Sequence, residues 1–406
     1  MSSKEWTSFK IEDLGRVVTG KTPPTQNSDN FGNKYPFITP RDMSGQKRII
    51  KTERYLSEEG KKTVKNCLLP KDAICVSCIG SDMGKVVLTT QDSVTNQQLN
   101  SIICKQEFNP DFVYYSIINI SDTLRNVAHH STAVPILNKS DFSNFEILSP
   151  AISTQNKIAS ILSALDDKLE LNRQTNATLE AIAQTIFKEW FVDFKFPGAT
   201  GEMQESELGM IPKGWTALPI YETAEFINGA AYKETDFTPD NSGLPVIKIA
   251  ELKYGITSQT RFSKTIKNEN SRIDNGDILF SWSGSPDTSI DVFVWAGDAG
   301  ILNQHIFRVV NGDTDKKYYE CYLLKYLKPI FIEIARDKQT TGLGHVTAQD
   351  MRRIKIAYPD KKSIGMFAEK IGPIFEKSLN NSLQTATLVR LRDSLLPKLM
   401  NGEIEA

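Results

Sequence analysis

The most regular pattern in the chain is an apolar repeat that advances in steps of four and three residues. It continues from Ile158 to Trp190 without a break, and such a repeat is typical of a helix that packs along a coiled-coil seam. Adding 209 to each position gives a second, more polar series. The alternative is an amphipathic helix lying on its own domain, which the polar Ser378 and Arg392 of the second series would favour. The two series are Ile158, Leu162, Leu165, Leu169, Asn172, Asn176, Leu179, Ala183, Ile186 and Trp190, and Phe367, Ile371, Ile374, Ser378, Asn381, Thr385, Leu388, Arg392, Leu395 and Leu399.

Outside these series the chain mixes short strand-like runs with short helices. Residues 73–79 and 85–89 are rich in β-branched residues and have strand length. Another short strand is expected directly after Trp6. Asn109 and Pro110 occupy N-cap and first-turn positions ahead of an apolar run, so a helix should begin there. The pattern therefore predicts an α/β (α+β) region ahead of the first long helix.

Short sequence motifs of the first half of the chain recur about 209 residues later. A period of this length predicts a duplicated domain, because the units of a solenoid run to about 20 to 50 residues. Gly20, Asp141 and Pro150 map on Gly229, Asp350 and Pro359 at the same offset. The other paired landmarks are PFITPRDM at 36–43 with PVIKIAEL at 245–252, Asn96-Gln97 with Asn303-Gln304, and STAVPILNKSDFSNFEILSP at 131–150 with TTGLGHVTAQDMRRIKIAYP at 340–359.

The connection between the halves predicts the direction of the two helices. Residues 193–214 are too few to return the chain along the first helix, so the helices should run antiparallel, with a globular domain at each end and a pseudo-twofold axis between them. Centring the two seams brings Asn176 near Asn381 and Asn172 near Thr385. Buried asparagines commonly fix the register of such helices, although a hydrated gap is an equal alternative.

A rod of this kind would set a distance between two DNA contacts. About 35 helical residues extend for roughly 50 Å, and the major groove of B-DNA returns every ~34–36 Å. Two domains on the rod would meet one face of a duplex about one to one and a half turns apart. The expected ligand is therefore a split DNA sequence with a spacer.

Composition limits the kinds of ligand and the cellular compartments that we expect for the protein. A net charge of -1 argues against a strong free-standing polyanion binder, since non-specific affinity for nucleic acid comes from neutralised phosphates. Five cysteines, most of them in apolar runs, indicate a reducing compartment. The N-terminus lacks a signal-peptide pattern, and no apolar run is long enough to span a membrane. We therefore expect a cytoplasmic protein.

Motifs that suggest catalysis lack the partners that the chemistry requires. Residues 15–22 match the Walker A pattern, but Pro23 and Pro24 follow at once and disfavour the helix that would cradle phosphate. Residues 109–112 (NPDF) fit a helix cap better than a methyltransferase motif. Cys75 and Cys78 have no second ligand pair for zinc, and four histidines form no acid-base set by spacing. The sequence indicates a DNA-recognition protein that is not an enzyme and holds no metal.

Polar residues in the non-periodic loops are the candidates for DNA contact. Asn and Gln suit adenine edges, whereas Arg and Lys suit guanine edges or phosphate. The recurrence of Asn96-Gln97 as Asn303-Gln304 also fits a shared scaffold role. The candidates are Lys21, Thr22, Arg41, Ser81, Lys85, Asn96, Gln97, Gln98, His129, His130 and Thr132 in the first half, and Lys233, Lys248, Trp282, Ser285, Asn303, Gln304, Gly342 and His345 in the second.

The chain resembles a known family over essentially its whole length, and three segments carry the resemblance most specifically. They are QNKIASILSALDDKLELN at 155–172, LEAIAQTIFKEWFVDF at 179–194 and ELGMIPKGW at 207–215. The family is the specificity subunit of type I restriction-modification enzymes, which act in phage defence.

The resemblance implies two target-recognition domains, each recognising half of a bipartite site in double-stranded DNA. It also implies that the conserved helices dock two modification (methyltransferase) subunits carrying S-adenosylmethionine, and that ATP- and Mg-dependent restriction subunits join the complex. No cofactor is expected on this chain. The alternatives are a self-contained DNA methyltransferase or nuclease, which is the rival from another class, and a stand-alone DNA-binding regulator or coiled-coil adaptor.

The expected domain boundaries follow from the motifs and the periodicity. They are target-recognition domain 1 at 1–150, a central helix at 151–195, a linker at 196–214, target-recognition domain 2 at 215–360 and a distal helix at 361–406.

Overall fold

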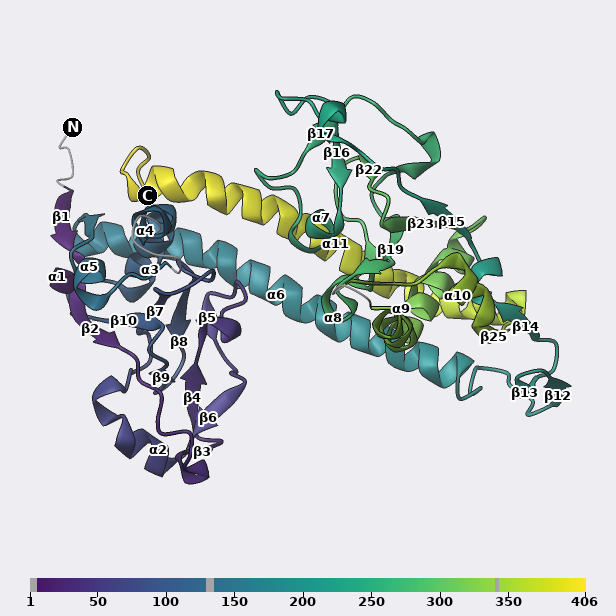
Figure 1. The fold of residues 1–406 in the computed structure, drawn as a ribbon, viewed down its shortest axis with the longest axis horizontal. Coiled ribbons are helices and arrows are strands. Elements are labelled where there is room, and N and C mark those ends of the chain that lie inside the picture. The colour runs from purple at the N-terminus through teal and green to yellow at the C-terminus, as the bar shows by residue number, and fades with distance from the viewer. Residues whose placement is uncertain (1–5, 129–134, 340–342) are drawn as a thin grey trace. The chain divides into compact units, whose positions relative to one another are not determined.

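The computed structural model describes residues 6–128, 135–339 and 343–406. The chain forms two compact units: unit 1 contains the chain up to Glu170 together with Leu388–Ala406, and unit 2 is Leu171–Thr387. Each of two 40-residue helices, α6 (Ile152–Phe191) and α11 (Lys361–Met400), contributes one part to each unit (Figure 1). The predicted long helices are therefore confirmed.

Unit 1 joins short strands and helices to the first part of α6. Its elements are β1 (Thr7–Lys10), α1 (Ile11–Leu14), β2 (Gly15–Thr19), η1 (Ser28–Asn30), β3 (Phe31–Gly32), β4 (Tyr35–Ile38), η2 (Pro40–Asp42), β5 (Arg48–Ile49), β6 (Arg54–Leu56), α2 (Glu58–Thr63), η3 (Lys65–Cys67), β7 (Ile74–Ser77), β8 (Val86–Thr89), β9 (Val94–Thr95), β10 (Leu99–Cys104), α3 (Pro110–Asn119), α4 (Ser121–Ala128), α5 (Lys139–Ser143) and β11 (Glu146–Ser149).

A sheet in the order β2-β10-β7-β8-β5 forms the centre of unit 1, and a second sheet has the order β3-β6-β4-β9. All four residues of β7 and of β8 are buried, because α3 packs on these strands. Asn109 caps α3 as predicted, since its side chain accepts the N–H of Phe112 at 3.1 Å. One hydrophobic cluster continues from the sheet through Phe112 to Leu162 and Leu399 of the long helices.

Unit 2 repeats this plan with a longer helix in place of α3 and α4. Its elements are β12 (Met203–Ser206), β13 (Gly209–Pro212), β14 (Thr216–Pro219), η4 (Ile220–Glu222), β15 (Glu225–Asn228), η5 (Glu234–Asp236), β16 (Leu244–Ile247), α7 (Ile249–Tyr254), β17 (Phe262–Ser263), η6 (Glu269–Ser271), β18 (Arg272–Ile273), β19 (Ile278–Ser281), β20 (Ser283–Gly284), α8 (Pro286–Ser289), β21 (Asp291–Val294), β22 (Gly300–Leu302), β23 (Ile306–Val310), α9 (Thr314–Asp337), β24 (Gly344–His345), α10 (Ala348–Arg353) and β25 (Lys355–Tyr358).

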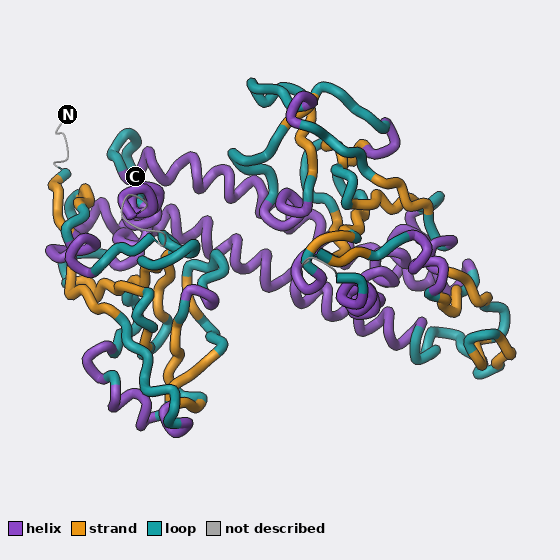
Figure 2. Tube along the Cα trace, viewed as in Figure 1, coloured by secondary structure: helices purple, strands orange, loops and turns teal. Residues whose placement is uncertain are grey.

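The main sheet of unit 2 has the order β15-β23-β19-β21, and a second sheet has the order β17-β16-β22-β18. The segment predicted as a linker contains the β12–β13 hairpin, which follows the end of α6 (Figure 2). The hydrophobic core of unit 2 combines Phe280 of the sheet, Phe331 of α9 and Phe367 of α11.

The duplication predicted from the sequence is present in the strand pairing and in the helix bounds. β1 pairs with β11 so that Thr7 faces Ser149, and β14 pairs with β25 so that Thr216 faces Tyr358. Adding 209 to the bounds of β1, β11 and α6 gives those of β14, β25 and α11. The two units therefore share a mixed α/β fold built on long helices, with β5 as an additional edge strand in the main sheet of unit 1. The pseudo-twofold relation between them stays a prediction.

Within each unit the parts of α6 and α11 run antiparallel. In unit 1, Asp166 of α6 pairs with Arg392 of α11. Lys157, nearer the start of α6, donates to the carbonyl of Ala406, which follows the end of α11. In unit 2, the rings of Trp190 and Phe367 are 5.9 Å apart. All twenty positions of the two predicted seams are buried or half-buried. The 4-3 pattern thus correctly predicted the faces that meet.

Polar side chains of the seam in unit 2 bond to one another. The Nδ2 of Asn381 donates to the Oδ1 of Asn176 at 2.9 Å, and the Nδ2 of Asn172 lies 3.4 Å from the Oγ1 of Thr385. Asn176 also donates to the carbonyl of Ser378 at 3.1 Å. These amides are satisfied across the helix pair, so the seam carries specific hydrogen bonds here in place of apolar packing.

Candidate nucleic-acid interface

In unit 1 the polar candidates gather at one end of the main sheet. β2 and β7 end there, at Thr19 and Ser77, and their antiparallel neighbours β10 and β8 begin there. β4 also ends there, because the carbonyl of Ile38 accepts the N–H of Asn96 at 3.1 Å. The candidates on the adjoining segments are Lys21, Thr22, Arg41, Ser81, Lys85, Asn96, Gln97 and Gln98.

A close backbone contact shapes the turn before β10. Gly20 donates its N–H to the carbonyl of Leu99 at 3.1 Å, and Lys21 donates to the carbonyl of Thr95 at 2.9 Å. A Cβ atom on Gly20 would lie 2.1 Å from the carbonyl oxygen of Asn96. Only glycine permits this approach, which presses the Gly20 loop against the turn at 95–99.

The side chains on this turn divide into buried and exposed members. Asn96 is buried and bonds through its amide to the Oε1 of Gln98 at 2.8 Å, while its Oδ1 accepts the N–H of Gln98 at 3.1 Å. Gln97 is exposed, and its Oε1 accepts the hydroxyl proton of Thr22 at 2.7 Å. Asn96 therefore supports the turn, whereas Gln97 is free to meet a ligand.

The basic candidates of unit 1 differ in their availability. Lys21 and Arg41 are exposed. Lys85 forms an ion pair with Asp82 at 2.7 Å. The Walker-like sequence is not a phosphate loop, because Gly15 to Thr19 form β2 and the residues directly after them are not helical.

Unit 2 has the same arrangement at the corresponding end of its sheet. Gly229 donates to the carbonyl of Ile306 at 3.1 Å, and a Cβ atom on it would lie 2.1 Å from the carbonyl oxygen of Asn303. Ala230 donates to the carbonyl of Leu302 at 3.0 Å, and Asn303 donates to that of Ile247 at 3.0 Å. The backbone frame around Asn96-Gln97 is thus repeated around Asn303-Gln304.

An aromatic and polar cluster surrounds this second turn. The Nε1 of Trp282 donates to the Oδ1 of Asn228 at 3.1 Å, and the Trp282 ring lies 5.7 Å from that of His305. The Nε2 of His305 is 3.2 Å from the Nε2 of the exposed Gln304. Asn228 and His305 were not among the candidates. Their only signal in the sequence is adjacency to Gly229 and Gln304.

The remaining candidates of unit 2 lie on segments beside this cluster. Ser285 follows β20, and the exposed His345 is opposite Ser283 in the β20–β24 pair. Lys248 is exposed at the end of β16, with its Nζ 5.4 Å from the ring of Phe237, and Lys233 is exposed before η5. His129, His130, Thr132 and Gly342 lie outside the described residues.

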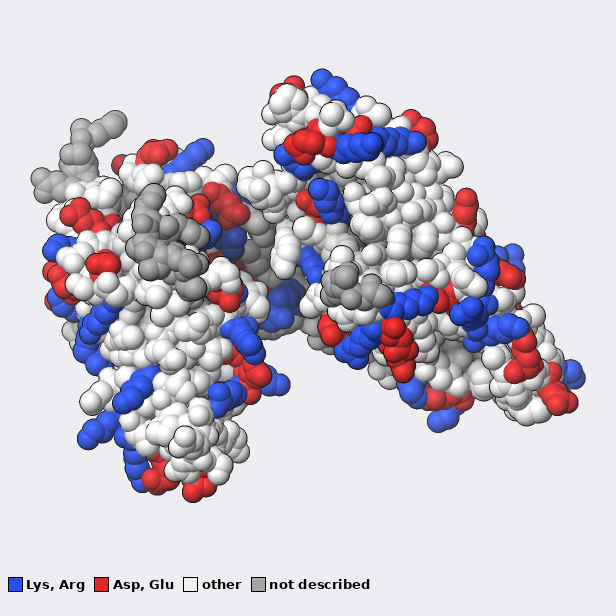
Figure 3. All heavy atoms as spheres, in the orientation of Figure 1, with Lys and Arg blue, Asp and Glu red and all other residues white. Residues whose placement is uncertain are grey.

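The surface charge near these loops is mixed in sign. Figure 3 shows Lys and Arg side chains interspersed with Asp and Glu on the face that it draws. Several of the cations are paired, for example Arg336 with Asp287 and Arg308 with Asp277. Such a surface gives weaker non-specific attraction to phosphate than an unpaired basic one.

The CxxC pair is part of the core of unit 1. Cys75 and Cys78 are buried, and burial raises the pKa of the Cys75 thiol to about 12 and that of Cys78 to about 11. Both side chains are therefore protonated thiols at neutral pH, which disfavours metal binding and nucleophilic chemistry.

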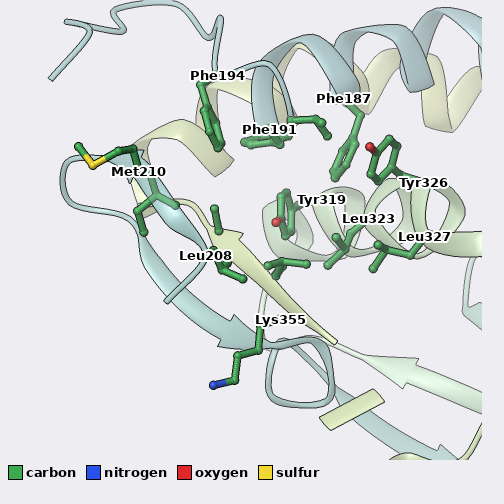
Figure 4. Close-up of a pocket in the computed structure, with 14 residues that line it drawn as sticks. Phe187, Phe191, Phe194, Leu208, Met210, Tyr319, Leu323, Tyr326, Leu327 and Lys355 are labelled. Atoms are coloured by element: carbon green, nitrogen blue, oxygen red, sulfur yellow. The ribbon is translucent and has the colours of Figure 1, made fainter. Parts of the chain in front are cut away.

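Unit 2 also carries an apolar groove with a cavity of about 240 Å³. The end of α6, the β12–β13 hairpin, α9 and β25 form its walls. Figure 4 shows the rings of Phe187, Phe191 and Tyr319 turned toward one another, while Met210 and Lys355 point outward. Met210 is 55% exposed and Leu208 42%. The rim of the groove thus exposes apolar side chains.

No helix in the described parts of the chain is long and apolar enough to cross a membrane.

Known proteins resemble the whole chain. The type I restriction modification DNA specificity domain matches residues 3–181 and again residues 212–388. The MjaIX specificity subunit of a type I restriction enzyme from Methanocaldococcus jannaschii is 30% identical, with 99% of this chain and 94% of the relative covered. The HindI specificity subunit from Haemophilus influenzae is 23% identical, with 98% and 100% covered.

The fold is shared with a solved structure. It is the S subunit of a type I restriction-modification system from M. genitalium, with a TM-score of 0.56 and 16% identity over 98% of this chain and 97% of that one. Two matches of one domain model agree with the duplicated strand pairing and helix bounds described above. The chain belongs to the family of type I restriction-modification specificity subunits.

Proposed function

We propose that this chain recognises a bipartite sequence in double-stranded DNA, with one part contacted by each unit. The observation that supports this most is the repeated backbone frame that holds an exposed glutamine, Gln97 or Gln304, at the end of a sheet. Exposed amides on a rigid turn suit direct contact with base edges. The loops around the two frames differ in sequence, as expected for two different half-sites.

Two modification (methyltransferase) subunits are the proposed protein partners. The apolar groove supports this, because it is lined by Phe187 and Phe191 from a segment that resembles the family and is flanked by exposed Leu208 and Met210. Exposed apolar clusters of this kind commonly mark protein contacts. The partners would carry S-adenosylmethionine, and restriction subunits would supply the ATP- and Mg-dependent step.

The groove can be tested with one charged substitution. Met210→Asp should weaken association with the modification subunits at least tenfold, because it places a carboxylate on an apolar contact surface. Tyr254→Asp is the matched control, since Tyr254 is 77% exposed in the same unit but does not line the groove. If both variants bind the modification subunits as tightly as the wild type does, the groove is not part of the surface that binds them.

We propose no catalytic role for the chain itself. The purified chain, incubated with DNA and labelled S-adenosylmethionine, should transfer no methyl group, whereas addition of the modification subunits should give transfer. Methyl transfer by the chain alone would overturn this part of the proposal.

Mapping of methylated positions tests the recognition role. A host that carries the chain with its modification subunits should methylate one split sequence. Exchange of residues 215–360 for those of another family member should change one half of that sequence only. A change in both halves, or methylation without a split sequence, would contradict the proposal.

A further inference from the structure

The two equivalent glutamines are each bonded to a neighbour, but through opposite ends of the amide. Gln97 uses its oxygen, which accepts from Thr22 at 2.7 Å. Gln304 uses its nitrogen, which lies 3.2 Å from the Nε2 of His305. Since the backbone around both residues is the same, the difference arises from the two neighbours.

Thr22 is well placed to hold its partner still. It is half-buried and lies between Lys21 and the buried Pro23 in the sequence. The N–H of Lys21 is bonded to the carbonyl of Thr95. Its hydroxyl occupies the Oε1 of Gln97, so that the two amide hydrogens of Gln97 are left for a ligand. The amide then offers two donors, while one of the two lone pairs of its oxygen is already used.

His305 is held more firmly still. Its ring packs against Trp282 at 5.7 Å, and Trp282 is itself fixed by the bond to Asn228. The Nδ1 of His305 is buried without a hydrogen-bond partner in the described part of the chain. Nε2 is therefore the ring nitrogen available for hydrogen bonding, and it contacts the amide nitrogen of Gln304. In the tautomer with its proton on Nδ1, the Nε2 of His305 accepts from the amide nitrogen, which leaves Gln304 with its oxygen and one amide hydrogen.

Neither anchor exists in the other unit. Adding 209 to Thr22 gives Ala231, which has no hydroxyl. The residue after Gln97 is Gln98, in the place that His305 takes after Gln304, and the Oε1 of Gln98 is bonded inward to Asn96 at 2.8 Å. Each unit thus carries one anchor and lacks the other.

We propose that Thr22 and His305 are positioning residues that fix the two glutamine amides in opposite senses and so give the units different base preferences. This inference rests on the proposed DNA recognition. Gln97 presents donors and selects an acceptor edge, such as O6 and N7 of guanine. Gln304 presents an acceptor and a donor and selects the N6 and N7 edge of adenine.

The test uses the full chain in complex with its modification subunits, on the mapped target and on duplexes with each base pair changed in turn. Gln304→Ala and His305→Asn should lose selectivity at the same base pair, about tenfold or more, as expected for a bidentate contact. His305→Gln should keep it, because a glutamine oxygen reaches about as far as Nε2. Gln97→Ala and Thr22→Val should lose selectivity at one base pair of the other half-site.

Further measurements separate positioning from loss of structure. Gln91→Ala and Gln259→Ala are the controls, since both residues are exposed and lie away from the two turns, and they should leave every preference unchanged. Replacing the selected adenine by 7-deazaadenine should weaken the wild type but not Gln304→Ala, because N7 is removed.

Distinct results would overturn the inference and the proposed function. Full selectivity in His305→Asn or Thr22→Val, with loss in the glutamine variants, would reject positioning. Full selectivity in the glutamine variants would reject both side chains as base contacts. A wild-type complex that shows no preference for any split sequence would instead reject the proposed function.

Discussion

The guanidinium of Arg392 in α11 donates to the carboxylate of Asp166 in α6 at 2.9 Å, so an ion pair joins the long helices within unit 1. The side chain of Asp166 is only 8% exposed, and its other oxygen accepts from the hydroxyl of Tyr115 at 2.6 Å. At the positions 209 residues away, unit 2 has three residues of its apolar core, which are Ala183, Phe375 and Leu324. One place in the duplicated fold thus holds a polar triad in one unit and apolar packing in the other.

Loss of Arg392 should destabilise unit 1 strongly. Arg392→Ala leaves a buried carboxylate without its cation, and such a change typically costs about 3–5 kcal/mol. Urea denaturation followed by circular dichroism measures the effect. The triple variant Tyr115→Leu, Asp166→Phe and Arg392→Ala copies the unit 2 set and should recover most of the loss. A triple variant no more stable than Arg392→Ala would show that the packing of unit 2 cannot be transferred.

The bonded asparagines of the helix pair lead to a second prediction. Asn381→Leu should lower stability by about 1–3 kcal/mol, because it removes the donor to the Oδ1 of the half-buried Asn176. Asn176→Leu combined with Asn381→Leu removes both polar groups and should be more stable than the single variant. Thermal unfolding of the three proteins makes the comparison, and a double variant below the single one would contradict it.

The sequence predicted the features that depend on local period and repetition. The bounds of α6 and α11 and the seam faces follow from the 4-3 pattern, because a continuous apolar stripe leaves few alternative structures. Arg392 looked like a weakness of the second seam, since its partner Asp166 is 226 residues away. The contact of Trp282 with Asn228 was also hidden, because three separate strands must be aligned to bring them together.

Some segments gave a weak or misleading local signal. The hairpin of β12 and β13 lies in a segment that was predicted to be a linker, because both strands are only four residues long and β12 is mostly polar. α9 runs through Pro329, a residue that normally argues against a helix interior. Its burial in the core of unit 2 outweighs the local preference, and this packing cannot be derived from the segment alone.

Glu320 should make the stability of unit 2 depend on pH. Its carboxyl is fully buried in α9, and the Oγ1 of Thr223, 2.8 Å from its Oε1, also donates to the carbonyl of Ile220. Burial raises the pKa of Glu320 from 4.5 to about 8. The folded state therefore keeps a proton that the unfolded chain releases, and stability falls as the pH rises from about 4.5 to about 8.

Glu320→Gln isolates this contribution. The variant cannot ionise, so its stability should match the wild type near pH 4.5 and exceed it by on the order of a few kcal/mol at pH 8. Denaturation at a series of pH values measures the difference between the two proteins. A difference that does not grow with pH would show that Glu320 is already ionised in the folded protein.

Alanine in place of Gly20 or Gly229 should disable one turn at a time. In both cases the added Cβ meets a backbone oxygen at 2.1 Å, so the turn that carries Gln97 or Gln304 must move. Selectivity for the corresponding half-site should fall at least tenfold in DNA-binding competition, while the other half-site is recognised as before. Gly312→Ala is the control, because its Cβ would meet nothing within 4 Å. Gly20→Ala changes the backbone of unit 1 only. An equal loss of selectivity at both half-sites in this variant would therefore show that the two turns do not act independently.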